Sequence, residues 1–463
     1  MRQEPGDTIA AISTPPGEGG IAVVRISGPD ALEVSGKVFT ACGKGTPSEH
    51  KTHTVRYGHA RHPVTGETLD EVLLTVMRAP KTYTKEDVVE INCHGGNVSV
   101  RKVLEACITS GARLAEPGEF TKRAFINGRI DLAQAEAVMD LISSETSKAQ
   151  RLALGQLAGG LSAKVEEIRL AVVDILALLE LSLDFSQEDV DIPPLSEVAL
   201  RVEKVLEDME ALSATAQGGM IIRSGASVVI CGKPNVGKSS LMNALLRHDR
   251  VIVAPVAGTT RDVVEESINL GGAKVHISDT AGITDTRDRV EMEGIRRSRE
   301  KLAAADLVIF MMDASCGVTE KDSAIYEAVK HKRTVIVMNK TDLGAAVSAD
   351  KAAKIFGNKD VVEMSVLSGT GLEKLEDTLS RKLFSGNVPS AESPAVTNLR
   401  HLDCLEKASA AARKALDMIL AAQSAELIAI DLGDTAHYLG LITGKSIEDD
   451  VLDRIFSGFC IGK

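Results

Sequence analysis

The chain has no tryptophan, and aromatic residues make up only 3% of its 463 residues. Its cores must therefore be largely aliphatic, which favours helical and α/β domains. No apolar run reaches the roughly 18 residues that a membrane-spanning helix needs, and no signal peptide is visible. We therefore expect a cytoplasmic protein with no membrane partner.

The seven cysteines are scattered, and none belongs to a C-x-x-C pair. Neither a zinc site nor a disulfide framework is therefore expected. The formal net charge of −12 excludes a protein that coats nucleic acid over its whole surface, although it leaves room for a local basic patch. The length suits two to four domains.

A phosphate-binding loop is the most specific feature that the chain does contain. Gly232–Ser239 reads GKPNVGKS and matches the pattern G-x-x-x-x-G-K-[ST]. The β-branched run Ser227–Ile230 precedes it and the helix-compatible segment Ser240–Leu246 follows, which is the strand–loop–helix context that phosphate binding requires. Lys238 is expected to reach the β- and γ-phosphates as a catalytic group, and the Ser239 hydroxyl to bind Mg²⁺.

Three further motifs follow in the order found in GTPases. Gly258–Asp262 contains Thr260, which we expect to be a second Mg²⁺ ligand and a catalytic residue, and Asp279–Gly282 ends a predicted strand. Asn339–Asp342 ends another strand, and its aspartate can accept hydrogen bonds from guanine N1 and N2, which adenine cannot offer. These motifs predict a GTPase rather than a general nucleotidase. The expected nucleotide contacts are Asn235, Val236, Gly237, Lys238, Ser239, Ser240, Thr259, Thr260, Asp279, Thr280, Ala281, Gly282, Asn339, Lys340, Asp342 and Ser365.

The chain lacks two groups that usually assist GTP hydrolysis. Ile283 stands where Ras-like proteins have a water-orienting glutamine, and no arginine finger can be recognised. Asn235 could bind a metal ion through its side-chain carbonyl, or it could simply form a turn hydrogen bond. The charged run from Arg287 to Lys301 is a solvated helix or a surface for a partner or RNA.

The remaining chain divides around the GTPase motifs. The first 125 residues predict a mixed α/β domain with strands at 8–12, 21–26, 72–76 and 88–91 and a helix at 98–110. Residues 126–222 and 385–463 show helical periodicity, and the G domain spans 223–384. The simplest interpretation is one discontinuous helical domain into which the G domain is inserted; two unrelated helical domains are the alternative.

The whole chain resembles the tRNA-modification GTPase family MnmE, also called TrmE. The resemblance rests on motifs at both ends as well as on the GTPase loops. These motifs are Thr14–Gly17 with Gly20, Arg25–Gly28, Glu86–Glu90, His94–Gly96, Pro117–Phe125, Asp131–Ala137 and the C-terminal Phe459–Lys463.

This resemblance implies a fold and a function. The fold combines an N-terminal α/β domain that binds folate and forms a homodimer, a discontinuous all-α domain and an inserted Ras-like P-loop G domain. The function is to build an aminomethyl-type group on C5 of the tRNA wobble uridine, with GTP as substrate. The implied partners are tRNA and a flavin-dependent MnmG-like protein in a heterotetramer. The implied one-carbon source is 5-formyl- or methylene-tetrahydrofolate.

The resemblance also assigns further site residues. A K⁺ ion replaces the arginine finger, and its matching positions are Asn235, Ala254, Val256 and Thr259. Glu291 matches the carboxylate that orients the attacking water. Folate contacts match Arg25, Glu90, Arg129 and Lys463, although Arg25 and Glu90 could be an ordinary ion pair. Cys460 matches a cysteine proposed to serve the modification, or it is a small buried hydrophobic residue.

Two positions depart from the family pattern. Thr284 replaces an arginine in the second switch, and Val366 replaces the alanine of the loop that contacts guanine O6. Two other functions remain open: a ribosome-assembly GTPase, and a G-protein switch whose folate site is only structural. The N-terminal block and the C-terminal tail favour the tRNA-modifying GTPase over the first of these.

Overall fold

The computed structural model describes residues 6–43, 45–184, 194–248, 266–279, 300–384, 393–446 and 449–463. The chain forms two compact units: the first contains Met1–Met139 and Thr443–Lys463, and the second contains Asp140–Pro255 and Arg261–Ile442. The C-terminal tail therefore packs with the N-terminal domain. The expected domain limits after residues 125, 222 and 384 stay predictions.

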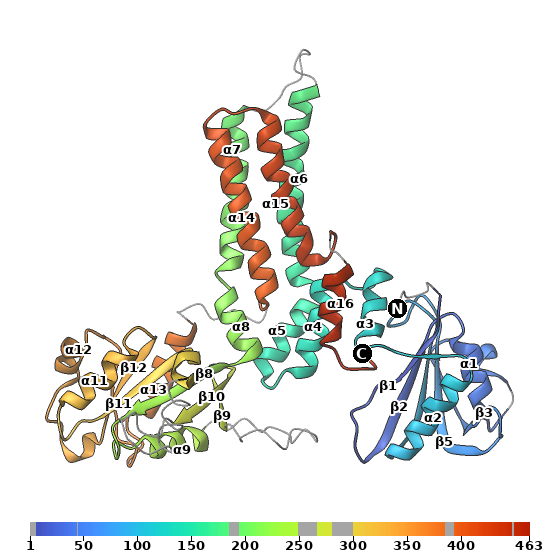
Figure 1. Ribbon diagram of the computed structural model, residues 1–463, viewed down its shortest axis with the longest axis horizontal. Helices are drawn as coiled ribbons and strands as arrows, with labels where there is room; N and C mark the ends of the chain where they lie inside the picture. Colours follow the sequence, from blue (N-terminus) through green and yellow to red (C-terminus); the bar gives the residue numbers. More distant parts are fainter. Residues whose placement is uncertain are drawn as a thin grey trace. The chain divides into compact units, whose positions relative to one another are not determined.

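The N-terminal unit is built on a seven-stranded sheet (Figure 1). All neighbouring strands are antiparallel except β1 and β7, which are parallel. The strands and the helix predicted for this part of the chain are confirmed. In spatial order the strands are β3 (Phe39–Ala41), β4 (Thr54–Arg61), β5 (Thr68–Met77), β6 (Val88–Gly95), β2 (Gly19–Ser27), β1 (Ile9–Ile12) and β7 (Arg113–Leu114).

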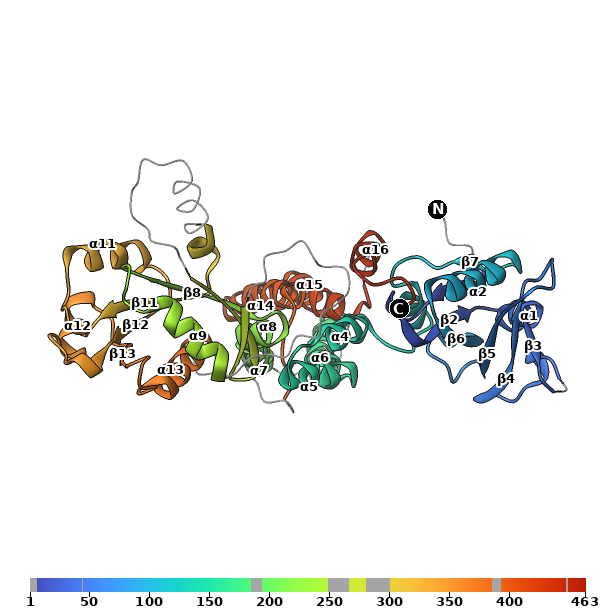
Figure 2. The same cartoon turned by 90° about the horizontal axis from the view of Figure 1, so that it is seen from below.

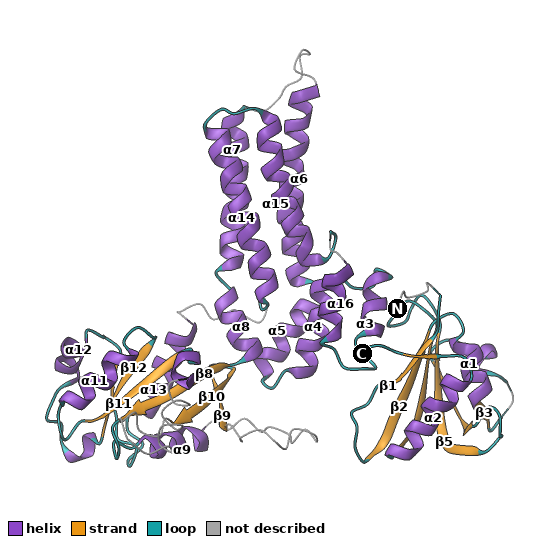
Figure 3. Cartoon of the chain, in the orientation of Figure 1, coloured by secondary structure: helices purple, strands orange, loops and turns teal. Residues whose placement is uncertain are grey.

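The two faces of this sheet are covered differently. Helices α1 (Ala31–Val38) and α2 (Asn97–Thr109) pack on one face, over an aliphatic core that includes Val24, Ile26 and Ile91 (Figure 3). Side chains alternate along a strand, so Arg25 and Glu90 belong to the opposite face. There α3 (Glu119–Ile126) contributes Phe120 to a smaller cluster around Ile9 and Tyr83.

An ionic network around the buried Glu119 connects α3 with β7 and with the segment that precedes β1. The Glu119 side chain is only 1% exposed and accepts hydrogen bonds from Arg113 at 2.7 Å and from Arg123 at 3.0 Å. The same two arginines pair with Asp7, and Arg123 also reaches Glu86 at 3.2 Å. Burial alone would raise the pKa of Glu119, but the hydrogen bonds from Arg113 and Arg123 hold it below its ordinary value.

The helical part is one domain built from two segments of the chain. The predicted apolar positions of α7, from Val198 to Leu212, are buried, and α7 packs against α14 (Figure 1). The Gln156 side chain donates to Ala395 O at 3.1 Å and to Thr397 Oγ1 at 2.9 Å, which joins the two segments. The helices of this part in the second unit are α5 (Ser147–Leu157), α6 (Gly160–Asp184), α7 (Leu195–Ser213), α8 (Ala216–Ser224), α14 (Leu399–Leu420) and α15 (Ala425–Thr443). Helix α4 (Leu132–Ser143) begins in the first unit, and α16 (Asp449–Ser457) belongs to the first unit, where both pack with α3.

The G domain contains a six-stranded sheet. Its β9 edge strand is antiparallel and the other strands are parallel. In spatial order the strands are β13 (Val361–Glu363), β12 (Thr334–Asn339), β11 (Leu307–Asp313), β8 (Ala226–Gly232), β10 (Ala273–Asp279) and β9 (Glu266–Leu270).

Helices cover both faces of this sheet (Figure 2). Helices α9 (Lys238–His248) and α13 (Leu372–Phe384) pack on one face, and α11 (Glu320–Val329) and α12 (Ala349–Phe356) on the other. In the described ranges no helix is both long and apolar enough to cross a membrane. The expected multidomain fold, with an α/β N-terminal domain, a discontinuous helical domain and an inserted G domain, is confirmed.

Candidate functional site

The phosphate loop lies between β8 and α9, where the backbone leaves no room for larger residues. Gly232 has φ +149°, and a Cβ there would lie 2.2 Å from Met311 O. Gly237 has φ +103°, and its Cβ would lie 2.5 Å from the Asn339 side-chain nitrogen. Asn235 takes the left-handed region at φ 63°. These constraints shape a loop that ends at the N-terminus of α9, where free N–H groups favour an anion.

Lys238 is held by the loop itself. Its Nζ donates to Gly232 O at 3.1 Å and to Lys233 O at 3.0 Å. These two carbonyls anchor the ammonium beside the N-terminus of α9, which begins at Lys238. A phosphate bound to the N–H groups of the loop would therefore meet a positioned positive charge.

The expected Mg²⁺ ligand Ser239 faces the aspartate of the third motif. Ser239 Oγ donates to Asp279 Oδ2 at 2.9 Å. Asp279 Oδ1 is buried, and within the described part of the chain it has no hydrogen-bond partner. A hydroxyl and a carboxylate with spare capacity are the hard oxygen donors that Mg²⁺ prefers, so these residues fit the ion.

The residues expected to contact guanine lie around a cavity of about 410 Å³. Asp342 Oδ1 accepts a hydrogen bond from Ser365 Oγ at 2.6 Å, which orients the carboxylate. Asn339 links this loop to the phosphate loop, because its Nδ2 donates to Val236 O at 2.8 Å and its Oδ1 accepts from Val366 N at 3.0 Å. The contact of Val366 with Asn339 uses only the backbone N–H and does not depend on the side chain. The effect of Val366 on the guanine O6 contact stays a prediction.

Asp313 is a supporting residue that the motif analysis did not identify. The Lys340 ammonium lies 2.7 Å from Asp313 Oδ2. Burial alone would raise the pKa of Asp313, but Lys340 and Ser315 hold it below its ordinary value. The sequence could have indicated Asp313 by its place at the end of β11, because ligands bind at the edge of a sheet that the carboxyl ends of its parallel strands form.

Several expected residues lie outside the described residues. They include the second Mg²⁺ ligand, most of the K⁺ site, the second switch and the water-orienting carboxylate. These residues are Ala254, Val256, Thr259, Thr260, Thr280, Ala281, Gly282, Ile283, Thr284 and Glu291.

The expected folate residues of the N-terminal unit lie close together around one aromatic ring. Arg25 pairs with Glu90 at 2.8 Å, and its guanidinium carbon lies 5.9 Å from the Tyr83 ring centroid and 5.6 Å from that of Phe120. The Arg129 guanidinium lies 4.8 Å from the same Tyr83 centroid. The two aromatic residues were not identified from the sequence, although Phe120 belongs to one of the quoted motifs.

The C-terminal tail of the chain reaches this group. Gly462 O accepts from Ser13 Oγ at 3.1 Å and from Arg25 at 3.4 Å. Gly462 has φ +93°, and a Cβ there would lie 2.3 Å from Ile12 O, so only glycine fits. Cys460 is an exposed free thiol, which contradicts the alternative of a buried hydrophobic residue. The N–H of Lys463 donates to Cys460 O at 3.3 Å.

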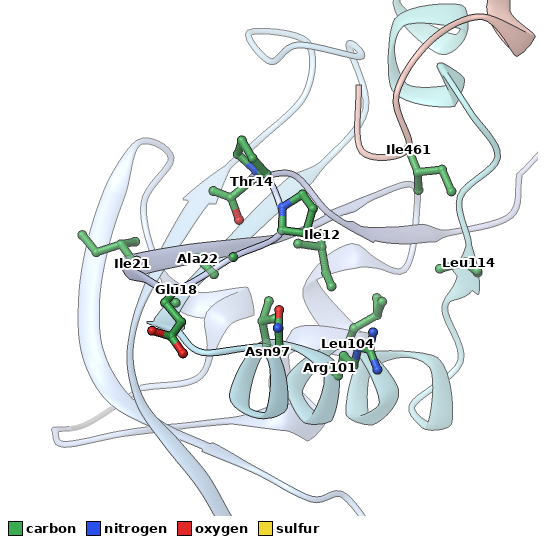
Figure 4. Close-up of a pocket in the computed structure, with 16 residues that line it drawn as sticks. Ile12, Thr14, Glu18, Ile21, Ala22, Asn97, Arg101, Leu104, Leu114 and Ile461 are labelled. Atoms are coloured by element: carbon green, nitrogen blue, oxygen red, sulfur yellow. The ribbon is translucent and has the colours of Figure 1, made fainter. Parts of the chain in front are cut away.

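A separate cavity of about 620 Å³ lies on the helix-covered side of the same sheet (Figure 4). Its wall is mainly apolar, and the tail contributes Ile461 at the end near Leu114, away from Glu18. Arg25 and Glu90 belong to the other face, so this cavity is not where the expected folate residues converge.

Comparison with known proteins identifies the family. Residues 8–129 match the family described as GTP-binding protein TrmE N-terminus, and residues 132–460 match the MnmE helical domain. The chain belongs to the MnmE family. It is 47% identical over 464 residues to the tRNA modification GTPase MnmE of Alkaliphilus oremlandii (strain OhILAs), which covers 99% of both chains. It is 45% identical to the protein of the same name from Levilactobacillus brevis, over 99% of this chain and 98% of the relative.

Solved structures resemble this MnmE-family chain over shorter stretches. Aquifex aeolicus Era bound to GDP and AlF₄⁻ is 32% identical, covers 40% of this chain and 66% of its own, and has a TM-score of 0.30. The G domain of T. maritima FeoB is 25% identical, covers 34% of this chain and 98% of its own, and has a TM-score of 0.27. Family membership, together with the nucleotide loops, identifies the chain as a GTP hydrolase.

Proposed function

We propose that this chain is a K⁺-stimulated GTPase that modifies the tRNA wobble uridine at C5. It works with a flavin-dependent MnmG-like partner and takes one carbon from a tetrahydrofolate. The observation that carries this proposal is that Arg25 and Arg129 lie over the Tyr83 ring while Glu90 and the C-terminal tail both contact Arg25. The same chain contains the loop that we expect to read guanine. The relatives named tRNA modification GTPase MnmE support it.

Mass analysis of tRNA tests the proposal directly. Wobble uridines from cells that lack this protein should lose their C5 substituent and regain it when the gene is restored. Intact substituents in the deleted strain would exclude the tRNA-modifying pathway. Lost GTP-dependent ribosome maturation with normal tRNA would instead indicate the ribosome-assembly alternative.

The proposed division of labour in the G domain follows from the loop geometry. Lys238 and the N–H groups of the loop bind phosphate, while Ser239 and Asp279 hold Mg²⁺ directly or through water, with Thr260 as the second hydroxyl ligand. When bound, Mg²⁺ and K⁺ stabilise the negative charge that develops on the phosphates. We assign Glu291 the orientation of the attacking water, since Ile283 cannot perform it.

The proposed K⁺ site predicts a salt-specific rate. Asn235 is an exposed residue of the phosphate loop. We assign its side-chain oxygen to the K⁺ site, together with the Ala254 and Val256 carbonyls and Thr259. GTP turnover should be faster in K⁺ than in Na⁺ at equal ionic strength, because the bound K⁺ would stabilise the transition-state charge in place of an arginine finger. Asn235→Ala should remove this difference, and equal wild-type rates in both salts would contradict the K⁺ assignment.

The folate proposal predicts that one arginine is essential for ligand binding. The Arg25 and Glu90 side chains are 19% and 24% exposed, so the pair is more enclosed than a surface ion pair worth about 0–1 kcal/mol. Arg25→Ala should abolish tetrahydrofolate binding in calorimetry while GTP hydrolysis continues. Arg61→Ala, at an exposed arginine of β4, serves as the matched control. Equal tetrahydrofolate affinity in the wild type, Arg25→Ala and Arg61→Ala would show that Arg25 is not part of the folate site.

Tail variants separate two roles within the same proposal. Deletion of Cys460–Lys463 removes the Gly462 contact with Arg25 and should weaken folate binding, whereas Cys460→Ser should leave binding unchanged and impair only the modification. Full affinity after the deletion would restrict the site to the N-terminal block.

We further propose that a homodimer forms through the N-terminal domain and that two MnmG-like subunits complete a heterotetramer. Light scattering of each protein and of the mixture tests both assemblies.

A further inference from the structure

Asp322 is a buried carboxylate in the G domain that belongs to none of the nucleotide motifs. Its side chain is 0% exposed and lies in the first turn of α11. Its Oδ2 atom accepts from Thr319 N at 2.9 Å and from Thr319 Oγ1 at 2.7 Å, which caps the helix. The same oxygen lies 2.7 Å from the Nζ of Lys233, which is the second residue of the phosphate loop.

The Lys233 side chain bridges the phosphate loop and the start of α11. Its Nζ also donates to Thr319 Oγ1 at 2.9 Å, and its side chain is only 17% exposed. The Lys233 ammonium is therefore held by the residues that cap α11. The backbone carbonyl of Lys233 makes a second contact, because Lys233 O accepts a hydrogen bond from Lys238 Nζ at 3.0 Å.

Helix capping alone does not explain a charged pair at this place. Thr319 and the carboxylate already form a capping box without any lysine. A buried carboxylate is costly unless it is paired, and Asp322 Oδ1 is buried with no hydrogen-bond partner in the described ranges. Lys233 is thus the charge that compensates Asp322, and the pair fixes the loop backbone at the residue whose carbonyl holds Lys238.

We propose that Asp322 and Lys233 are positioning residues for GTP hydrolysis. They act through the Lys233 carbonyl on the ammonium of Lys238, which contacts the phosphates. Loss of either charge lets this carbonyl shift and misplaces the ammonium relative to the γ-phosphate. The effect should be larger on the rate of hydrolysis than on nucleotide affinity, since the N–H groups of the loop still bind phosphate.

The test compares Asp322→Asn, Lys233→Met and the double variant in the full-length protein. Each single variant should lower kcat at saturating GTP about tenfold, which is less than removal of a transition-state donor costs, because Lys238 remains. The double variant should be no slower than the singles, since both act through one contact. Lys233→Arg should restore part of the rate. Lys321→Met, at an exposed lysine of the same helix turn, should behave as wild type.

Thermal unfolding and nucleotide titration distinguish positioning from a structural role. If the pair only stabilised α11, Asp322→Asn would lower the melting temperature and leave kcat of the folded protein unchanged, and this result would overturn the proposal. Additive losses in the double variant would also overturn it. If Asp322→Asn fails to fold, the kcat values of Lys233→Met and Lys233→Arg still test the proposal, because Thr319 and Asp322 can cap α11 without the lysine.

Discussion

Asp342→Asn should convert the chain from a guanine to a xanthine nucleotide specificity. The Asp342 carboxylate is oriented by Ser365 at 2.6 Å at the edge of the base cavity. It can accept two charge-assisted hydrogen bonds from guanine, and an asparagine would face these donors with a donor of its own. GTP affinity should fall about a hundredfold or more, since each such bond is worth about 1.5–3 kcal/mol.

Competition binding with fluorescent GTP and XTP measures this exchange. Xanthine carries an oxygen at C2, so the asparagine amide can donate to it and XTP affinity should rise relative to GTP. Asp350→Asn, at an exposed position in the first turn of α12, is the matched control. An Asp342→Asn protein that still prefers GTP would show that Asn339–Asp342 does not read the base.

Glu119→Gln should destabilise the N-terminal domain by about 2–4 kcal/mol, because it leaves two arginines facing a neutral side chain in a buried network. The largest loss of hydrogen-exchange protection is expected in β1, β7 and α3, which the network connects. Glu116→Gln changes an exposed glutamate three residues earlier and should have little effect. Equal protection in the two variants would exclude a stabilising role for the network.

The same network predicts the direction of acid sensitivity. The pKa of Glu119 in the folded chain lies below its ordinary value of 4.5, so its contribution to stability is fully present above about pH 4.5. That contribution is lost as the pH falls through the lower, folded pKa. The wild-type domain should therefore lose protection on acidification below pH 4.5, and Glu119→Gln should lose less over the same range.

The nucleotide loops could be predicted from the sequence because each is short and has a fixed local context. A strand, a glycine turn and a helix start lie within one stretch of chain, so the local pattern alone predicts where Lys238 and Ser239 stand. The helical periodicity of α7 was likewise readable, because one apolar face repeats every three to four residues.

Contacts between distant segments could not be predicted in the same way. No local pattern indicates that the Lys233 ammonium meets Asp322, that both Arg25 and Arg129 lie over the Tyr83 ring, or that Gly462 O approaches Arg25. The packing of whole helices and strands determines which of these residues meet. A charged residue looks the same in the sequence whether its side chain is solvated or forms an ion pair. The local motifs of the sequence are thus sufficient to identify the family and its GTPase activity. The residues that support each site are determined only by the tertiary packing.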